Sequence, residues 1–167
     1  MELRHFVRVI ALIGVLALIG SACTSTASKE SIPVLTEAAS VDLQARTFMR
    51  ACQDVLCVGT PMYASDETPA PVREAIKETF TDEVEYLSES SLEAIADTNG
   101  VFDSGGTLIN VGNVHRTERS DVVGVDAWIA RGLYNVVGRT YLWRWDGSVW
   151  VTTTPDAVDV TVTTAVS

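Results

Sequence analysis

The strongest constraint on the fold lies in the C-terminal part of the sequence, where four β-prone runs follow one another. The runs are rich in Val, Ile, Tyr, Trp and Thr, and polar or glycine-containing connectors separate them. They cover Leu108 to Val114, Asp121 to Ala130, Val136 to Trp145 and Ser148 to Thr154. Because short connectors join antiparallel neighbours, the pattern predicts an antiparallel β-meander.

A hairpin is predicted between the last two runs. Asp146-Gly147 is typical of a two-residue type I′ turn, which would place Trp143 opposite Trp150. One face of the hairpin then carries the aromatic side chains Tyr141, Trp143, Trp145 and Trp150. The other face carries Leu142, Val149 and Val151. We expect the Trp-rich face to be core rather than a sugar or peptide platform.

Helical patterns dominate the region before the meander. An amphipathic pattern without Gly or Pro runs from Thr36 to Gln53, and a second helix is predicted over Val72 to Phe80. Shorter elements are predicted as strands within 57–64 and 83–87, a helical turn over 90–97 capped by Ser90 or Ser91, and a last strand over 158–162. The predicted fold class is α+β, with N-terminal helices packed on a C-terminal antiparallel β-meander of four or five strands.

The first 22 residues have the pattern of an export signal. Arg4 and Arg8 precede an uninterrupted apolar run from Val9 to Gly20. A membrane-spanning helix needs about 20 apolar residues, and this run supplies only about a dozen. The segment is therefore expected to be removed rather than retained as a span.

The junction Ile19-Gly20-Ser21-Ala22-Cys23 resembles the lipobox of bacterial lipoproteins, although Gly20 stands where Leu is commonest. The resemblance implies cleavage after Ala22 and a diacylglyceryl group on Cys23, so that acyl chains hold the protein to a membrane surface. The alternative is an ordinary secretory signal that ends in Ser-Ala-Cys. The expected organisation is a signal peptide (1–22), a flexible tether (23–31) and one extracytoplasmic α+β domain (32–167) at a bacterial cell membrane.

The cysteine count agrees with export. With Cys23 assigned to lipid, Cys52 and Cys57 remain as a pair in an oxidising compartment and predict a disulfide. Residues five apart on a continuous helix have Cα atoms about 8.5 Å apart, beyond the roughly 7 Å that a disulfide bridges. The helix must therefore end or turn between Gln53 and Leu56.

Charge limits the partners of the mature chain. Beyond residue 22 it keeps 10 of the 12 Lys and Arg and 21 of the 22 Asp and Glu, a formal charge of −11. Such a balance repels phosphate backbones, so nucleic acid is not expected as a partner. The expected contacts are the membrane, through lipid on Cys23, and an envelope protein or small ligand.

No catalytic, cofactor-binding or metal site is predicted, and three residues are candidates for a pocket: His115, Asp126 and Arg139. Asp126 interrupts an apolar run, so it needs a partner, and Arg139 or Arg144 on the next predicted strand could supply a structural ion pair. His115 is the only histidine beyond the signal and is expected in a solvated hairpin loop, where Asp121 or Glu118 could pair with it.

Other acidic groups carry weaker signals. Glu74, Glu78 and Asp82 recur every four residues and predict a solvated helix face rather than a glycosidase pair. Asp97, Asn99 and Asp103 lie in a glycine-rich loop, but their spacing misses the pattern of a calcium loop.

Two hypotheses of function follow from these patterns. The leading one is a lipid-anchored envelope domain that binds or scaffolds a partner through a sheet face or the edge from His115 to Asp121. The alternative is a small extracytoplasmic enzyme that uses acid–base carboxylate chemistry at Asp126 or Glu83. Burial of Trp143 and Trp150 under the helices would exclude the Trp-rich face as the binding surface.

Overall fold

The computed structural model describes residues 34–158, all within the unit Ile32–Ser167. The predicted signal peptide, Cys23, the tether and most of the predicted tail strand lie outside the described residues. The helices are α2 (Glu37–Val55), α3 (Ala70–Thr79), α4 (Glu89–Ala94) and α5 (Pro155–Val158). The strands are β1 (Met62–Ser65), β2 (Val84–Leu87), β3 (Thr107–Arg116), β4 (Val122–Ala130), β5 (Val136–Trp145) and β6 (Trp150–Thr153).

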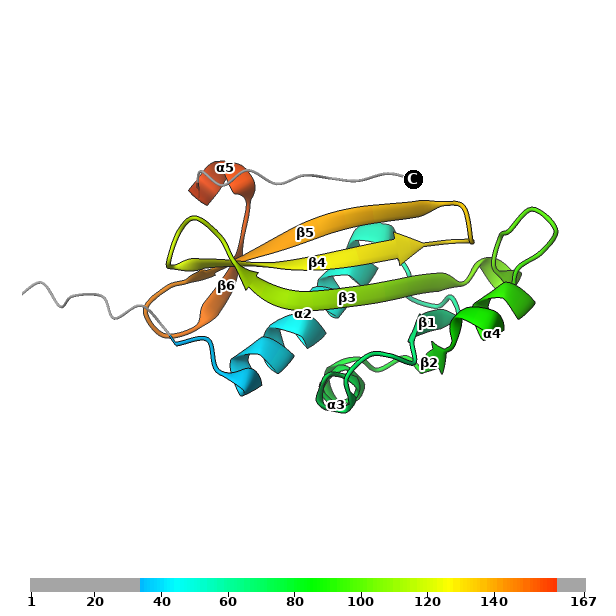
Figure 1. Cartoon of the computed structure of the whole chain (residues 1–167), viewed down its shortest axis with the longest axis horizontal. Helices are drawn as coiled ribbons and strands as arrows, with labels where there is room; N and C mark the ends of the chain where they lie inside the picture. The colour runs from blue at the N-terminus through cyan, green and yellow to red at the C-terminus, as the bar shows by residue number, and fades with distance from the viewer. Residues whose placement is uncertain (1–33, 159–167) are drawn as a thin grey trace, which may run out of the picture. The chain divides into compact units, whose positions relative to one another are not determined.

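The six strands form one mixed sheet in the order β2-β1-β3-β4-β5-β6 (Figure 1). The α+β class is as predicted, and β3 to β6 form the antiparallel meander. The meander has four strands, but it is not the whole sheet as predicted, because β1 and β2 extend the sheet to six strands beyond β3 with parallel pairing. Parallel neighbours need a crossover, and α3 supplies it between β1 and β2. Strands β1 and β2 thus alternate along the chain with the helices that precede the meander.

Helix α2 begins and ends at residues whose conformations stop the helical ladder. The Thr36 side chain accepts a hydrogen bond from the Ala39 backbone N–H at 3.1 Å, which caps the first turn. At the other end Leu56 adopts a left-handed conformation with φ 54°, which ends the helix between Cys52 and Cys57 as their spacing demands. The buried stripe of the helix consists of Leu43, Gln44, Ala45, Thr47, Phe48, Ala51 and Cys52.

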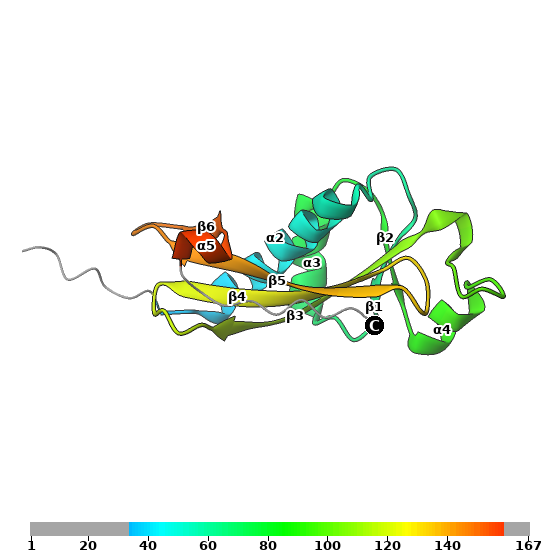
Figure 2. The same cartoon turned by 90° about the horizontal axis from the view of Figure 1, so that it is seen from above.

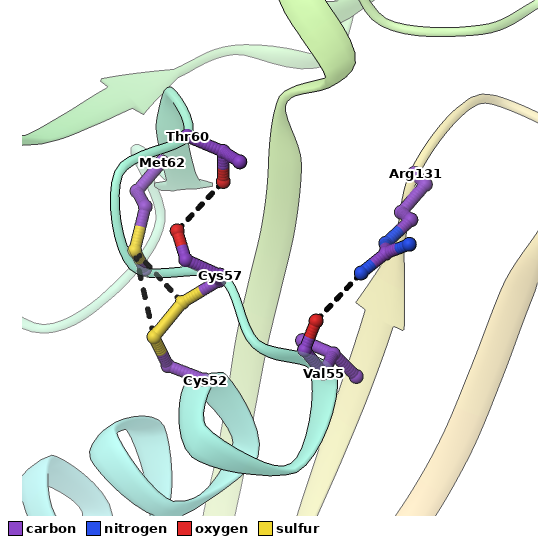
Figure 3. The surroundings of a disulfide bond; sticks show 6 residues. All are labelled: Cys52, Val55, Cys57, Thr60, Met62 and Arg131. Carbon is purple, nitrogen blue, oxygen red and sulfur yellow. Dashed lines mark hydrogen bonds between the residues drawn. A yellow bond between two sulfur atoms is a disulfide. The ribbon is translucent and has the colours of Figure 1, made fainter.

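The predicted disulfide joins Cys52 at the end of α2 to Cys57, with Cα atoms 5.1 Å apart (Figure 3). Both cysteines are buried, and their sulfur atoms lie against Sδ of Met62 at the start of β1. Closing so short a loop stabilises the fold by only about 2 kcal/mol on the chain-entropy account. Its main effect is to hold the connection between α2 and β1 against the core.

Two layers cover opposite faces of the sheet. Side chains of α2 and α3 pack on the face that includes Met62, Ile109, Ala127 and Ile129. On the opposite face, α4 and Phe102 cover only the end of the sheet near β1, where they enclose a small cluster with Tyr63, Ala130 and Leu108. Figure 2 shows α2 above the sheet and α4 below its far end.

The Trp-rich face of the last hairpin is core, as expected. Trp143 is 2% exposed and Trp150 is 7% exposed, and both pack in a cluster with Leu43 of α2. The Trp143 indole N–H donates to Thr47 Oγ1 at 3.0 Å, and the Arg46 guanidinium lies 4.3 Å from the Trp143 ring. This burial excludes the Trp-rich face as a binding surface.

The register of that hairpin differs from the predicted one by two residues. Trp145 pairs with Trp150, so residues 146–149 form the loop. Asp146 Oδ1 accepts hydrogen bonds from the backbone N–H groups of Ser148 and Val149 at 2.9 and 2.8 Å, which closes a longer turn than type I′. Because the shift is even, the four aromatic side chains keep the predicted face.

The buried hydrogen bond between Thr47 and Trp143 gives a test of the packing of α2. We expect Thr47→Val to lower the free energy of unfolding by about 1–3 kcal/mol, because the buried indole N–H loses its acceptor without a change of side-chain shape. Denaturant unfolding measures the change. The control Thr47→Ser keeps the hydroxyl and loses one methyl group, so the free energy of unfolding should fall by only about 1 kcal/mol. The Trp143 indole N–H should stay protected from hydrogen exchange in this variant. Equal stability of Thr47→Val and wild type would contradict this assignment.

Candidate functional site

The middle of the sheet is solvent-facing on the side turned away from α2. In β4 the residues Val123, Val125, Ala127 and Ile129 pack toward the helices, so the alternate positions face the other way. We call this surface the open face, and its central residues are Asn110, His115, Gly124, Asp126, Trp128, Gly138 and Thr140. Val122 and Leu142 on the same side are buried, and Ala130 is covered together with Phe102. The open face is therefore bounded along the strands at both ends.

A β-bulge in β3 brings His115 onto the open face. The register between β3 and β4 shifts between Val111 and Val114, so both of these valines pack toward the α2 side. His115 then points away from α2 and belongs to a strand that continues to Arg116, not to a hairpin loop as predicted. The interpretation of the stretch from His115 as a solvated connector is corrected accordingly.

Asp126 stands at the centre of a polar cluster on the open face. Its Oδ1 accepts a hydrogen bond from Thr140 Oγ1 at 2.6 Å, and its Oδ2 lies 3.8 Å from His115 Nδ1. The side chains of His115 and Asp126 are 46% and 40% exposed. The expectation of a buried carboxylate is wrong, and the partner of His115 is Asp126 rather than Asp121 or Glu118.

Glycines on neighbouring strands make room for two aromatic rings beside Asp126. A Cβ atom on Gly124 would lie 2.5 Å from His115 Nε2, so the imidazole lies directly over that glycine. A Cβ atom on Gly112 would lie 3.2 Å from Trp128 Cζ3 and 3.5 Å from the Asp126 backbone oxygen. The Trp128 indole thus lies over Gly112 in the bulge, close to the backbone of Asp126. We call His115, Asp126, Trp128 and Thr140 the Asp126 cluster.

Trp128 was not among the residues singled out from the sequence. It is 46% exposed, whereas Trp143 and Trp150 are buried. Its position two residues after Asp126 on an alternating strand could have placed both side chains on one face. The hydrogen-bonding partner Thr140 was also missed, because only the register between β4 and β5 pairs it with Asp126.

Arg139 lies on the other face and does not pair with Asp126. It pairs in register with Ala127, and its Nη1 lies 3.3 Å from Asp54 Oδ2 near the end of α2. Tyr141 donates a hydrogen bond to the same oxygen at 3.0 Å. Arg131 donates to the Val55 carbonyl at 2.6 Å (Figure 3). These contacts fix the end of α2 to the sheet, so the predicted ion pair is replaced by a structural cluster around Asp54.

Burial raises the pKa of Tyr141 to about 12, and the negative charge of Asp54 adds to the shift because it disfavours a second anion nearby. The hydroxyl therefore remains a donor to Asp54 across the physiological range. This arrangement stabilises the protein and offers no acid or base for chemistry near pH 7.

The loop that contains Asp97 has a structural role. One carboxylate oxygen of Asp97 accepts hydrogen bonds from the backbone N–H groups of Asn99 and Val101, both at 2.8 Å. The bond from Val101 is the main reason that the pKa of Asp97 lies below its ordinary value. Across residues 34–158 no group of three or more His, Cys, Asp or Glu could hold a metal ion.

A shallow groove of about 490 Å³ lies between α2 and α3. Its lining is apolar at Val41, Ala45 and Ala75 and acidic at Glu37, Asp42 and Glu78. Asp42 already pairs with Arg46 on the next turn at 3.3 Å. Glu78 lies beside this groove, so the predicted solvated face of α3 borders a surface hollow.

The Asp126 cluster does not have the arrangement of a catalytic triad. In a catalytic triad the base takes the proton of the nucleophile and the carboxylate orients the base. Here the Thr140 hydroxyl donates to the carboxylate, and the imidazole lies beside that carboxylate instead of the hydroxyl. The cluster can offer a flat aromatic ring, a partly free carboxylate oxygen and an imidazole to a ligand.

Comparison with known proteins gives no relative for this chain: no family model, no curated protein and no solved structure matches it. Among the described residues no helix is both long and apolar enough to cross a membrane.

The raised pKa of Tyr141 predicts a specific loss of stability at high pH. The folded-state pKa of about 12 exceeds the ordinary value of 10.0, so the stabilisation is complete below pH 10 and is lost as pH rises toward about 12. Unfolding free energies measured across this range should fall less steeply for Tyr141→Phe than for wild type. Asp54→Asn should lower the pKa of Tyr141 in an absorbance titration, and Asp42→Asn, which alters a remote carboxylate, should not. Parallel stability curves for Tyr141→Phe and wild type would refute the assignment.

Proposed function

We propose that this chain is a lipid-anchored, extracytoplasmic protein of a bacterial cell envelope, whose α+β domain binds a partner through the open face of the sheet. The export pattern before Cys23 and the lipobox resemblance support the location. The bridged pair Cys52 and Cys57 agrees with an oxidising compartment. The open face supports the binding role.

The observation that carries the binding role is the exposure of Trp128 inside the Asp126 cluster. Aromatic side chains contribute large apolar areas, and Trp143 and Trp150 of the last hairpin bury theirs in the cluster with Leu43 of α2. Trp128 instead keeps 46% of its surface in water, on the same sheet face as the carboxylate, imidazole and hydroxyl of the cluster. Exposed Trp next to polar groups is typical of the centre of a protein interface.

The acid–base enzyme hypothesis has no comparable support in the geometry. Its named residue Asp126 is half-buried on a sheet face, and Glu83 lies on the exposed connection before β2. A general acid needs an environment that holds its proton near neutral pH, usually burial or a second carboxylate close by. We therefore carry only the binding function forward.

The anchor is tested by replacing the cysteine at the lipobox junction. We expect Cys23→Ser to move the protein from the membrane fraction to the soluble extracytoplasmic fraction, because each acyl methylene that leaves the bilayer interior costs about 0.8 kcal/mol. Detergent phase partitioning and mass spectrometry of the N-terminus measure the outcome. Thr24→Ser, which keeps Cys23, is the matched control. Unchanged membrane attachment, or recovery of protein that still carries residues 1–22, would contradict the anchor.

The binding face is tested with full-length protein that carries 5-fluorotryptophan. Its four tryptophans lie in different environments, so ¹⁹F NMR can follow each after assignment by Trp→Phe variants. We expect solubilised envelope proteins to shift or broaden the Trp128 resonance while the buried Trp143 and Trp150 stay unchanged. Lipid vesicles and peptidoglycan fragments are added in separate arms. The proposal fails if the Trp128 resonance responds to none of them, or if Trp145 on the opposite face responds in its place.

A further inference from the structure

Within residues 34–158, part of one edge of β5 next to the Asp126 cluster has no strand partner. β6 pairs only with Leu142 to Trp145, and no described residue pairs with 136–141 on the side away from β4 (Figure 1). An edge strand presents a row of free backbone N–H and C=O groups to any extended chain that approaches. The stretch also contains Val136, Val137 and Tyr141, which favour strand pairing.

On the open face, β5 lacks a side chain at one position next to Thr140, the residue that pairs with Asp126. Gly138 is the open-face residue of β5 opposite Trp128, and it has no side chain. The Trp128 indole leans the other way, toward Gly112 on β3. A side chain that enters from the edge over Gly138 therefore meets no side chain of β5 at that position.

The group at the end of this path is anionic. Asp126 Oδ1 is engaged by Thr140, whereas Oδ2 is 3.8 Å from His115 Nδ1, beyond hydrogen-bond distance. A strand added to β5 would lie about 10 Å from β4, since strands are spaced by about 4.8 Å. The long stem of Lys or Arg can cover most of that span and place its charge beside Oδ2. The formal charge of −11 beyond residue 22 also favours a basic partner.

From this juxtaposition we infer that the partner of the open face is an extended, basic protein segment: its backbone pairs with the 136–141 edge of β5, and a Lys or Arg side chain crosses Gly138 to Asp126. The inference rests on the proposed binding role of the open face and adds the chemistry of the partner. Asp126 supplies charge recognition. Thr140 holds the carboxylate in place.

The test uses the full-length protein in detergent and the labelled peptide Val-Thr-Val-Lys-Val-Thr-Val. Matched peptides carry norleucine or Glu in place of Lys, and a fourth carries N-methylated backbone groups. We expect the Lys peptide to bind at least about threefold more tightly than the norleucine peptide and the Glu peptide to bind most weakly, the range of a partly exposed ion pair. The N-methylated peptide should not bind. Hydrogen exchange should show new protection at residues 136–141.

Two variants separate charge from pairing. Asp126→Asn keeps an acceptor for Thr140 and should abolish the preference for Lys while norleucine binding stays unchanged. Gly138→Val should block the path for the Lys stem yet favour the strand conformation, so it also removes the preference. The denaturant concentration at the midpoint of unfolding should be at least that of wild type for both variants. Hydrogen exchange of the free variants shows whether β5 is intact.

Equal binding of the Lys, norleucine and Glu peptides would overturn the inference, and so would protection at any segment other than 136–141. If the peptide binds only after residues 159–167 are removed, the occupant of the β5 edge is the chain's own C-terminus, and the inference of a separate partner is refuted. A Trp128 resonance that responds to envelope proteins, together with an unprotected β5 edge, would refute this inference alone. If no envelope component changes the Trp128 resonance, the proposed function itself is refuted.

Discussion

The packing of α2 across one face of the sheet is the interaction on which the rest of the structure depends. Leu43 and Phe48 are almost completely buried, and Thr47 accepts the indole N–H of Trp143 at 3.0 Å. The disulfide after Cys52 and the contacts of Asp54 fix the far end of the helix. Because one helix covers this face along β3 to β5, the alternate residues of the same strands must face the other way. The composition of the open face is thus a consequence of where α2 lies.

The open face combines local features that each have a simple physical origin. The bulge in β3 adds a residue and turns His115 away from α2. Gly112 and Gly124 leave space into which the rings of Trp128 and His115 fold. The result is a carboxylate flanked by two flat rings on an otherwise shallow surface. Such a surface is consistent with the proposed binding of an extended partner, whereas most proteins bind small substrates in concave pockets.

The ionic groups on the two faces of the sheet have different roles. On the α2 side, Arg139 and Tyr141 converge on Asp54 and hold an element of the fold in place. On the open side, Asp126 is held by one neutral hydroxyl and keeps capacity for another contact. A carboxylate already paired with an arginine has little to offer a ligand, whereas one oriented by a hydroxyl retains its charge. The difference between the faces therefore bears directly on the proposed function.

The sequence by itself determined the types of the main elements, the α+β class and the bridged cysteines, because periodicity and the five-residue spacing are local properties. The predicted cap of α4 at Ser90 or Ser91 is wrong, since Ser88 caps that helix and both of these serines lie inside it. The sequence also placed the aromatic side chains of the hairpin on one face, since that assignment needs only alternation along a strand. Only the tertiary structure decided the parallel addition of β1 and β2, the hairpin register and the partner of Asp126. Arg139 and Thr140 are adjacent in the chain and lie on opposite faces of β5, so the partner of Asp126 depends on which residue of β5 shares its face. Pairing across strands and an inserted bulge set that relation, and neither can be predicted from the local sequence pattern.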